Sequence, residues 1–419
     1  MPTSPQTSTC AQAACRLCGA GLQETFADLG MSPLANSYVP VVRANEMEPF
    51  YPLHAQVCTQ CWLVQLQEYE AATNIFDDYA YFSSYSDSWL AHARRYTEAM
   101  VSRFGLGPAS AVVEIASNDG YLLQYFQQAG IPVLGIEPSG NVAQAAIDKG
   151  IPTRVEFFGT TAARRLVAEG RQADLLLGNN VLAHVPDLND FVAGMKLALK
   201  PGGIVTMEFP HLEKLVEQCQ FDTIYHEHFS YFSLCAVERV FSKHGLTLFD
   251  VEELPTHGGS LRVYVRHEEA SKLPVTKAVE EMRQREKAAG YEGIDLYRSF
   301  YQRVCETKRN LLEFIIGAKR AGKSIVGYGA AAKGNTLLNF CGIGTDMIDY
   351  TVDRNPHKQG RLLPGTRIPV HAPETIDRTR PDYVLILPWN LRDEVTRQMA
   401  HIARWGGRFV VPIPRVEVI

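Results

Sequence analysis

The sequence predicts an α/β protein in three parts, a small cysteine-rich metal-binding segment followed by two Rossmann-like units. Three observations lead to this fold class. Paired cysteines stand near the N-terminus, a strand, a polar turn and a helix follow one another over 111–126, and another strand runs into a glycine-rich turn over 324–335. At 419 residues and 46% hydrophobic content the chain exceeds what one core holds. We expect domains at 1–80, 81–270 and 271–419.

The composition favours small-molecule chemistry. A net charge of −5 without a basic cluster argues against nucleic acid or a membrane surface as partner. Every apolar run ends before the roughly 18 residues that span a bilayer, and the start of the chain lacks the regions of a signal peptide. We therefore expect a cytoplasmic protein. The oligomeric state stays open, a monomer included.

The first segment carries two Cys-x2-Cys knuckles, formed by Cys15 and Cys18 and by Cys58 and Cys61. Two knuckles complete a tetrahedral four-thiolate zinc site, whereas the alternative is a set of buried free cysteines. Four protein ligands leave no position for water or substrate. The predicted zinc is therefore structural and does no chemistry. We also expect it to be remote from the reacting centre, because the cysteines lie far in sequence from residues 221–232.

The central segment begins with helical spacing after a tyrosine-rich stretch and continues as a nucleotide-binding βαβ unit. A strand over 111–115 runs into a polar turn, a strand over 132–136 ends in an acid suited to ribose hydroxyls, and the strand around 175–177 ends in paired asparagines. A further strand covers 204–208. The turn has alanine where glycine is usual. The candidate cofactor-binding residues are Glu114, Ala116, Asn118, Asp119, Gly120, Glu137, Pro138, Asn179 and Asn180.

Residues 221–232, FDTIYHEHFSYF, follow the last of these parallel strands and concentrate ionisable groups. Ligands of open α/β sheets bind at the carboxyl ends of the strands, so we predict the reacting centre here. In an extended segment His226 and His228 would share a side, whereas in a helical turn Tyr225 would share a face with His228. The sequence does not choose between these, and a buried polar network is the structural alternative.

The remaining sequence predicts a helix over 233–245, an edge hairpin over 246–252 and 260–266, connecting helices over 274–322, and a second Rossmann-like unit with strands at 324–327, 348–352 and 383–387. A glycine turn with a lysine at a helix N-terminus suits phosphate. The candidate substrate-binding residues are Gly329, Lys333, Asn335, Asp353 and His357, with Ser260 and Arg262 on the hairpin.

Taken together, the knuckles, the central unit, Tyr225-His-Glu-His228 and the turn GYGAAAKGN (327–335) resemble the S-adenosylmethionine (SAM)-dependent sugar C-methyltransferases, which act on nucleotide-linked 4-ketosugars. The resemblance covers nearly the whole chain. It implies a class I methyltransferase fold, SAM as cofactor and methylation at C-3′. It also implies that His228 is the base, supported by Tyr225, Glu227, His184 and a tyrosine that we assign to Tyr79, for which Tyr81, Tyr85 and Tyr96 compete.

The residues agree with this chemistry. Methylation of carbon requires removal of the proton beside a carbonyl, and a histidine can act as that base. Glu227 could orient an imidazole and Tyr225 could donate to an enolate oxygen. Three alternatives remain: an O- or N-methyltransferase, which needs no α-proton abstraction, a dinucleotide-dependent oxidoreductase, and a zinc-ribbon protein that binds nucleic acid.

Overall fold

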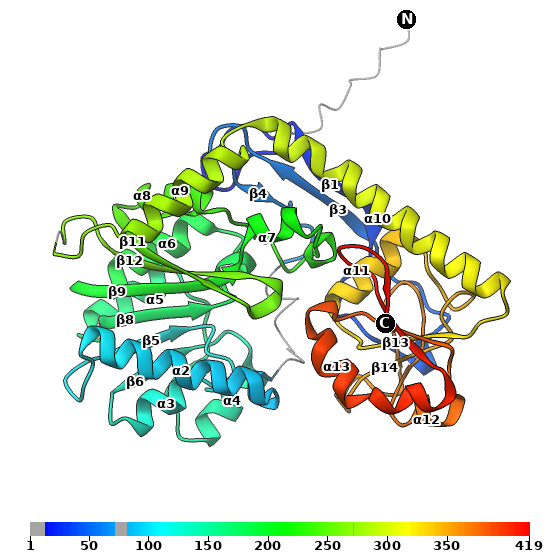
Figure 1. Cartoon of the computed structure of the whole chain (residues 1–419). Coiled ribbons are helices and arrows are strands. Elements are labelled where there is room, and N and C mark those ends of the chain that lie inside the picture. The colour runs from blue at the N-terminus through cyan, green and yellow to red at the C-terminus, as the bar shows by residue number, and fades with distance from the viewer. Residues whose placement is uncertain (1–12, 72–81, 271) are drawn as a thin grey trace, which may run out of the picture.

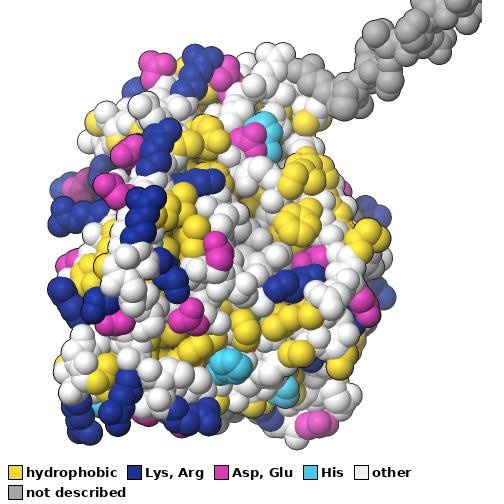
Figure 2. Space-filling view, turned by 90° about the vertical axis from the view of Figure 1, so that its right-hand side faces the viewer, with side chains coloured by type: hydrophobic (Ala, Val, Ile, Leu, Met, Phe, Trp, Pro, Cys, Tyr) yellow, Lys and Arg dark blue, Asp and Glu magenta, His cyan; other side chains and the backbone are white. Residues whose placement is uncertain are grey.

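Three main sheets organise the chain (Figure 1), which is described by a computed structural model over residues 13–71, 82–270 and 272–419. The predicted Tyr79 and its competitor Tyr81 lie outside the described residues. Within those ranges, no helix has the length and hydropathy needed to cross a bilayer. On the face drawn in Figure 2, Lys and Arg side chains alternate with Asp and Glu along one edge.

The N-terminal sheet has the order β1-β3-β4-β10 and takes its last strand from the middle of the chain. Its strands are β1 (Glu24–Ser32), β3 (Tyr51–Val57), β4 (Val64–Gln65) and β10 (Ser230–Tyr231). In β3, Leu53, Ala55 and Val57 are buried at alternate positions, as expected of a sheet with one face on a core. A separate pair joins β2 (Val39–Pro40) to β15 (Arg361–Leu362). The stretch predicted to hold the chemistry therefore contributes a strand to the cysteine-rich unit.

The central sheet has seven strands in the order β11-β12-β9-β8-β5-β6-β7, with the predicted antiparallel hairpin at one edge. All four residues of β5 are buried, which suits the middle of a parallel sheet with helices on both faces. The strands are β5 (Val112–Ile115), β6 (Val133–Ile136), β7 (Thr153–Arg154), β8 (Ala173–Asn179), β9 (Leu199–Pro210), β11 (Leu246–Leu254) and β12 (Ser260–His267). The helices are α2 (Asp87–Phe104), α3 (Leu123–Gln128), α4 (Gly140–Asp148), α5 (Thr160–Ala168), α6 (Leu188–Ala198), α7 (Leu212–Glu217) and α8 (Leu234–Ser242).

The C-terminal sheet has the order β16-β14-β13-β17-β18-β19, parallel except for its last strand. Its strands are β13 (Ile325–Tyr328), β14 (Thr351–Val352), β16 (Val370–His371), β17 (Tyr383–Ile386), β18 (Arg408–Val411) and β19 (Glu417–Val418), and its helices are α11 (Ala332–Cys341), α12 (Thr375–Thr379) and α13 (Arg392–Gln398). The strand predicted over 348–352 is shorter than expected. The amide of Ile348 bonds the carbonyl of Gly344 at 3.0 Å in a turn, which removes it from the sheet.

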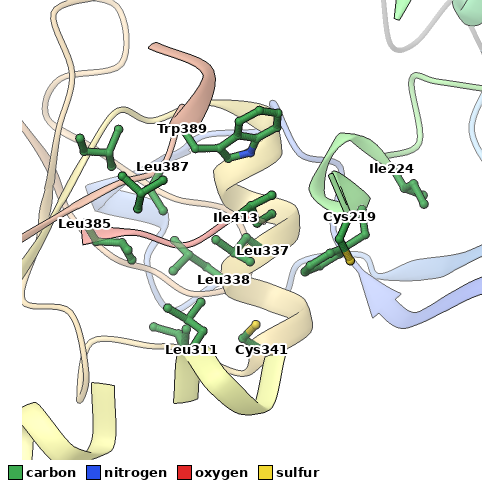
Figure 3. Packing of buried hydrophobic residues seen from close by; sticks show 14 of the residues in the cluster. Cys219, Ile224, Leu311, Leu337, Leu338, Cys341, Leu385, Leu387, Trp389 and Ile413 are labelled. Carbon is green, nitrogen blue, oxygen red and sulfur yellow. The ribbon is translucent and has the colours of Figure 1, made fainter. Parts of the chain in front are cut away.

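The connecting helices are α9 (Lys277–Ala289) and α10 (Ile294–Arg320), as predicted. Figure 1 shows α10 running along the N-terminal sheet toward the C-terminal unit, and the ring of Phe300 stacks on Phe26 of β1 at 4.4 Å between centroids. Figure 3 shows Cys219 and Ile224 approaching α11 from the side, where the Thr336 hydroxyl donates to the Ile224 carbonyl at 3.1 Å. One buried cluster therefore joins the N-terminal sheet, residues before the histidine turn and the C-terminal unit.

Candidate active site and metal centre

The four predicted metal ligands come together. The sulfurs of Cys15, Cys18, Cys58 and Cys61 all lie within 4.8 Å of one another, and the Sγ atoms of Cys15 and Cys61 are 3.5 Å apart. Backbone bonds shape both knuckles, from Gly19 N to the Cys15 carbonyl and from Trp62 N to the Cys58 carbonyl. A tetrahedral zinc with bonds of about 2.3 Å separates its sulfurs by about 3.8 Å. The cluster therefore fits a closed four-thiolate zinc site.

Tyr225 to His228 form a tight turn, closed by a hydrogen bond of 2.8 Å from His228 N to the Tyr225 carbonyl. The rings of Tyr225 and His228 lie 4.0 Å apart between centroids, inclined by 34°. Of the two arrangements that the sequence left open, the structure shows the turn, with Tyr225 and His228 on one side. The turn follows η4 (Phe221–Thr223) and precedes β10.

The tautomer of His228 follows from one contact. Its Nδ1–H donates to the Thr223 carbonyl at 2.9 Å, which leaves Nε2 as the basic nitrogen. Burial, reinforced by neighbouring His184, holds the pKa of His228 well below its usual range. The His184 ring meets the His228 ring edge-on at 4.7 Å, and burial lowers the pKa of His184 to about 4. Two imidazoles are therefore neutral and adjacent near pH 7.

The side chains of the other two residues of the turn bond the N-terminal segment. Glu227 Oε1 accepts from Asn36 Nδ2 at 2.7 Å, and burial raises the pKa of Glu227 to about 7 although Asn36 and Lys358 oppose the shift. The ring of His226 donates from Nε2 to the Pro52 carbonyl at 3.2 Å. The two central residues of the turn are thus bonded to the N-terminal segment, His226 to β3 and Glu227 to Asn36 between β1 and β2.

The tyrosines that competed with Tyr79 lie in different environments. Tyr85 is 71% exposed in η2 (Ser83–Tyr85), whereas Tyr96 is buried on α2, with its hydroxyl 2.5 Å from that of Thr206. Among the described residues, neither tyrosine contacts the turn formed by Tyr225 to His228.

The predicted cofactor residues meet at the carboxyl ends of β5, β6 and β8. Glu137 accepts from the amides of Asn118 and Ser139, both at 2.9 Å, so this acid fixes the turn after β5. Pro138 follows it directly, and Glu114 is fully buried in β5, where burial raises its pKa well above the usual range. The carboxylate atom Asp119 Oδ1 and the amide atom Asn180 Oδ1 are buried without a partner in the part of the chain described. Unpaired buried acceptors at strand ends fit a polar ligand.

The backbone of the β5 turn explains its unusual residues. Ala116 and Asn118 have φ of 55° and 49°, so the alanine occupies a left-handed position that favours glycine. A Cβ on Gly120 would stand 2.9 Å from Ile151 Cγ1. Sequence reasoning missed Ser83 N, which donates to Asn118 Oδ1 at 3.0 Å, because no motif marks that contact.

The structure separates the predicted substrate residues of the C-terminal unit. Lys333 lies near the turn, bonding Asn390 Oδ1 at 2.8 Å with its ammonium 4.6 Å from the Trp389 ring. Asn335 instead donates to the Ala35 carbonyl of the N-terminal segment at 2.6 Å.

The other three lie in or beside the turns that follow β13 and β14. Gly329 has φ of 92° and packs so closely that a Cβ would stand 2.5 Å from Pro388 Cδ. Asp353 accepts from the amides of Ala330 and Asn355 at 2.7 and 2.8 Å. His357 is exposed on the loop that follows.

The two hairpin residues also take structural positions. Arg262 of β12 donates to Glu208 of β9 at 2.9 Å and to Glu252 of β11 at 2.9 Å, and Glu208 is also 3.0 Å from the His92 ring nitrogen. Ser260 donates to the Thr256 carbonyl at 3.0 Å. These contacts order the hairpin loop that reaches the C-terminal unit.

His257, on that loop, was not among the predicted site residues. It has φ of 55°, and its Nε2 accepts from Asn180 Nδ2 at 3.1 Å, where Asn180 also has φ of 55°. Burial and the Lys333 ammonium lower the pKa of His257 to about 4. Two residues with left-handed backbone that bond each other at the end of a parallel strand are typical of functional sites. The sequence signal for this residue is a histidine before paired glycines, a pattern that is also typical of a simple hairpin connection.

Comparison with known proteins assigns each part of the chain to a family. Residues 89–251 match a family described as "Methyltransferase domain", residues 255–414 match "C-methyltransferase C-terminal domain", and residues 15–76 match "Putative zinc binding domain". The fold and the polar strand ends define a class I SAM-dependent methyltransferase with an N-terminal zinc-binding domain.

One relative with high coverage identifies the family within this class of methyltransferases. The chain is 36% identical to the C-methyltransferase NovU of Streptomyces niveus over 405 residues, 97% of this chain and 96% of that protein. It therefore belongs to the C-methyltransferase family. A ubiquinone biosynthesis O-methyltransferase of Methylobacterium nodulans is 33% identical over 100 residues, 23% of this chain and 39% of that protein. The SAM-bound magnesium protoporphyrin IX methyltransferase of Synechocystis PCC 6803 matches 46% of this chain and 88% of its own, at 13% identity and a TM-score of 0.32.

Proposed function

We propose that this C-methyltransferase acts on a nucleotide-linked 4-ketosugar, at C-3′, with His228 as the base. The observation that carries the proposal is the tautomer of His228, whose Nδ1–H is engaged by Thr223 so that Nε2 can take a proton. A neutral base is needed at physiological pH, and burial keeps this imidazole neutral.

The residues around His228 suit an enolate. The base takes the proton from the carbon beside the ketone, and the electron pair moves to the carbonyl oxygen. Tyr225, whose ring centroid is 4.0 Å from that of His228, is placed to donate to this oxygen. SAM supplies an electrophilic methyl group, so that a carbon–carbon bond forms as the methyl–sulfur bond breaks.

The nucleotide diphosphate is assigned to the N-terminus of α11. Its amides and Lys333 provide positive potential, and the Lys333 ammonium is near enough to lower the pKa of His228. Burial lowers the pKa of Lys333, and Asp222, whose Oδ2 accepts from Trp389 Nε1 at 2.7 Å, opposes that shift. The sugar would then extend from the C-terminal unit to the turn, and holding it beside the cofactor supplies much of the rate.

The test follows the α-hydrogen. Nucleotide-4-ketosugars are incubated in D₂O with enzyme and the demethylated cofactor, and exchange at the α-carbon is measured by mass spectrometry. Exchange, followed by a carbon-bound methyl group when SAM is added, is expected. His228→Ala should lower both rates by roughly 10²- to 10⁴-fold while SAM still binds. His371→Ala, an exposed histidine of β16, is the matched control.

A lack of exchange with every 4-ketosugar, or a methyl group on oxygen or nitrogen, would reject the proposal. The second result would identify an O- or N-methyltransferase instead.

A further inference from the structure

We propose that Arg16, inside the first zinc knuckle, is a positioning residue that sets the relative placement of His184 and His228. The inference rests on the proposed function in taking His228 as the base. The sequence suggested a metal site remote from the chemistry, because the cysteines lie far from the histidines along the chain. The fold brings the knuckle and the turn into contact.

The guanidinium of Arg16 contacts residues that lie close in sequence to His184 and to His228. Arg16 Nη1 donates to the Pro186 carbonyl at 2.7 Å, two residues beyond His184. The guanidinium carbon lies 5.3 Å from the ring centroid of Phe229, the residue after His228. Its Nη2 donates to the Leu66 carbonyl, immediately after β4.

These same segments are bonded to each other. Phe229 N donates to the Ala183 carbonyl at 2.7 Å, and Leu66 N donates to the Phe229 carbonyl at 3.0 Å. Arg16 therefore contacts three chain segments, those at Pro186, Phe229 and Leu66. The backbone hydrogen bonds among these segments hold His184 beside His228. A planar fork with several donors can bond two carbonyls and lie on a ring, which no apolar side chain can do.

Gln65 ties this junction to the metal ligands. Its Nε2 donates to Cys15 Sγ at 3.1 Å, its Oε1 accepts from Arg16 N at 2.9 Å, and its backbone pairs with Ser230 in β10. The knuckle is also fixed from the methyltransferase side, because Asn189 Nδ2 donates to the Arg16 carbonyl at 2.7 Å. The position of the metal ligands thus determines where Arg16 places the turn.

The test compares Arg16→Met with Arg16→Lys and with Arg43→Met. Arg43 is an exposed arginine of the same N-terminal segment, paired with Glu46, and serves as the matched control. The full-length protein is used, with zinc content, kcat, KM for SAM and hydrogen exchange of the 224–232 peptide measured for each variant.

Arg16→Met should retain its zinc, keep KM for SAM within about twofold, and lose kcat by roughly 10- to 100-fold, because a small displacement of a base has effects of that size. Amide exchange across 224–232 should become about tenfold faster or more, since an opening that costs about 1.4 kcal/mol less is tenfold more populated. Arg16→Lys should have a higher kcat than Arg16→Met, because the lysine ammonium can still bond one of the two carbonyls. Arg43→Met should match the wild type.

Three results would overturn the inference: wild-type kcat in zinc-bound Arg16→Met, unchanged amide exchange over 224–232, or loss of zinc in both Arg16 variants. The last would make Arg16 a part of the metal fold alone. If the wild-type enzyme exchanges no ketosugar hydrogen, the proposed substrate fails, whereas the amide-exchange comparison still decides whether Arg16 positions the turn.

Discussion

Burial decides the charge of single residues in the histidine turn, and Glu227 gives the clearest test. Its raised pKa, about 7, means that ionisation opposes folding above the ordinary pKa of a glutamate. This cost is absent below pH 4, grows as pH rises to about 7, and is then constant. Glu227→Gln keeps an oxygen to accept from Asn36 and has no charge to bury.

Glu227→Gln should therefore be more stable than the wild type at pH 8, by up to about 3 kcal/mol, and should lose this advantage at pH 4. Melting temperatures across that range measure the difference. The control is Glu306→Gln, whose carboxylate is exposed on α10. A stability difference that does not change with pH would show that Glu227 is not buried in its charged form.

At the scale of elements, the loop between β11 and β12 joins the methyltransferase sheet to the C-terminal unit. Gly258 has φ of 93°, and a Cβ there would stand 2.6 Å from Trp389 Cη2 and 2.9 Å from Gln220 Nε2. Gly258→Ala must therefore strain the loop or push it from Trp389. We expect a loss of about 2 kcal/mol and faster amide exchange over 255–261.

Gly107→Ala is the matched control, since a Cβ at Gly107 meets nothing within 4 Å. It should change stability by less than about 0.5 kcal/mol. Equal melting temperatures for the two variants, measured by calorimetry, would contradict the close contact with Trp389.

Local patterns predicted the elements well, and long-range pairings account for what was missed. The buried run before Glu114, the hairpin of β11 and β12, and the knuckles all have signals within a few residues. In contrast β10 is two residues long and pairs with β4, far away in sequence, so no local pattern marks it. The sequence did not predict roles for Arg16 and His257 for the same reason, because those roles depend on partners that only the fold brings near.

The same limit applies to Lys333 and Asn335 on α11. The glycine turn predicted a single phosphate-binding group that contains both residues. Because Lys333 and Asn335 are two positions apart, they are separated by about half a helical turn, and their side chains reach different units of the protein. Lys333 lies near the histidine turn, whereas Asn335 bonds Ala35. The spacing of two residues predicts that they lie on different faces of a helix, but it does not predict which neighbouring unit each face contacts.

At the scale of the whole molecule, we expect the four-cysteine metal site to stabilise two units together. Its knuckles are joined to the methyltransferase unit through the bond from Arg16 to the Pro186 carbonyl and the bond from Asn189 of α6, and the N-terminal sheet shares a core with the C-terminal unit. Removing the metal should therefore disorder more than the cysteine-rich segment. Cys58→Ser, or chelation, is expected to lower the zinc content, the melting temperature and the activity together.

The identity of the metal should matter much less than its presence. Four cysteine thiolates would fill the coordination shell of a tetrahedral ion, so we expect that substrate cannot bind the metal and that it takes no part in the reaction. We expect the Co²⁺- and Cd²⁺-loaded proteins, prepared from the chelated chain, to recover the zinc enzyme's kcat within about twofold, because both ions accept tetrahedral thiolate ligands. A kcat that follows the Lewis acidity of the metal would instead place the ion at the reacting centre, and full activity of the metal-free chain would remove its structural role.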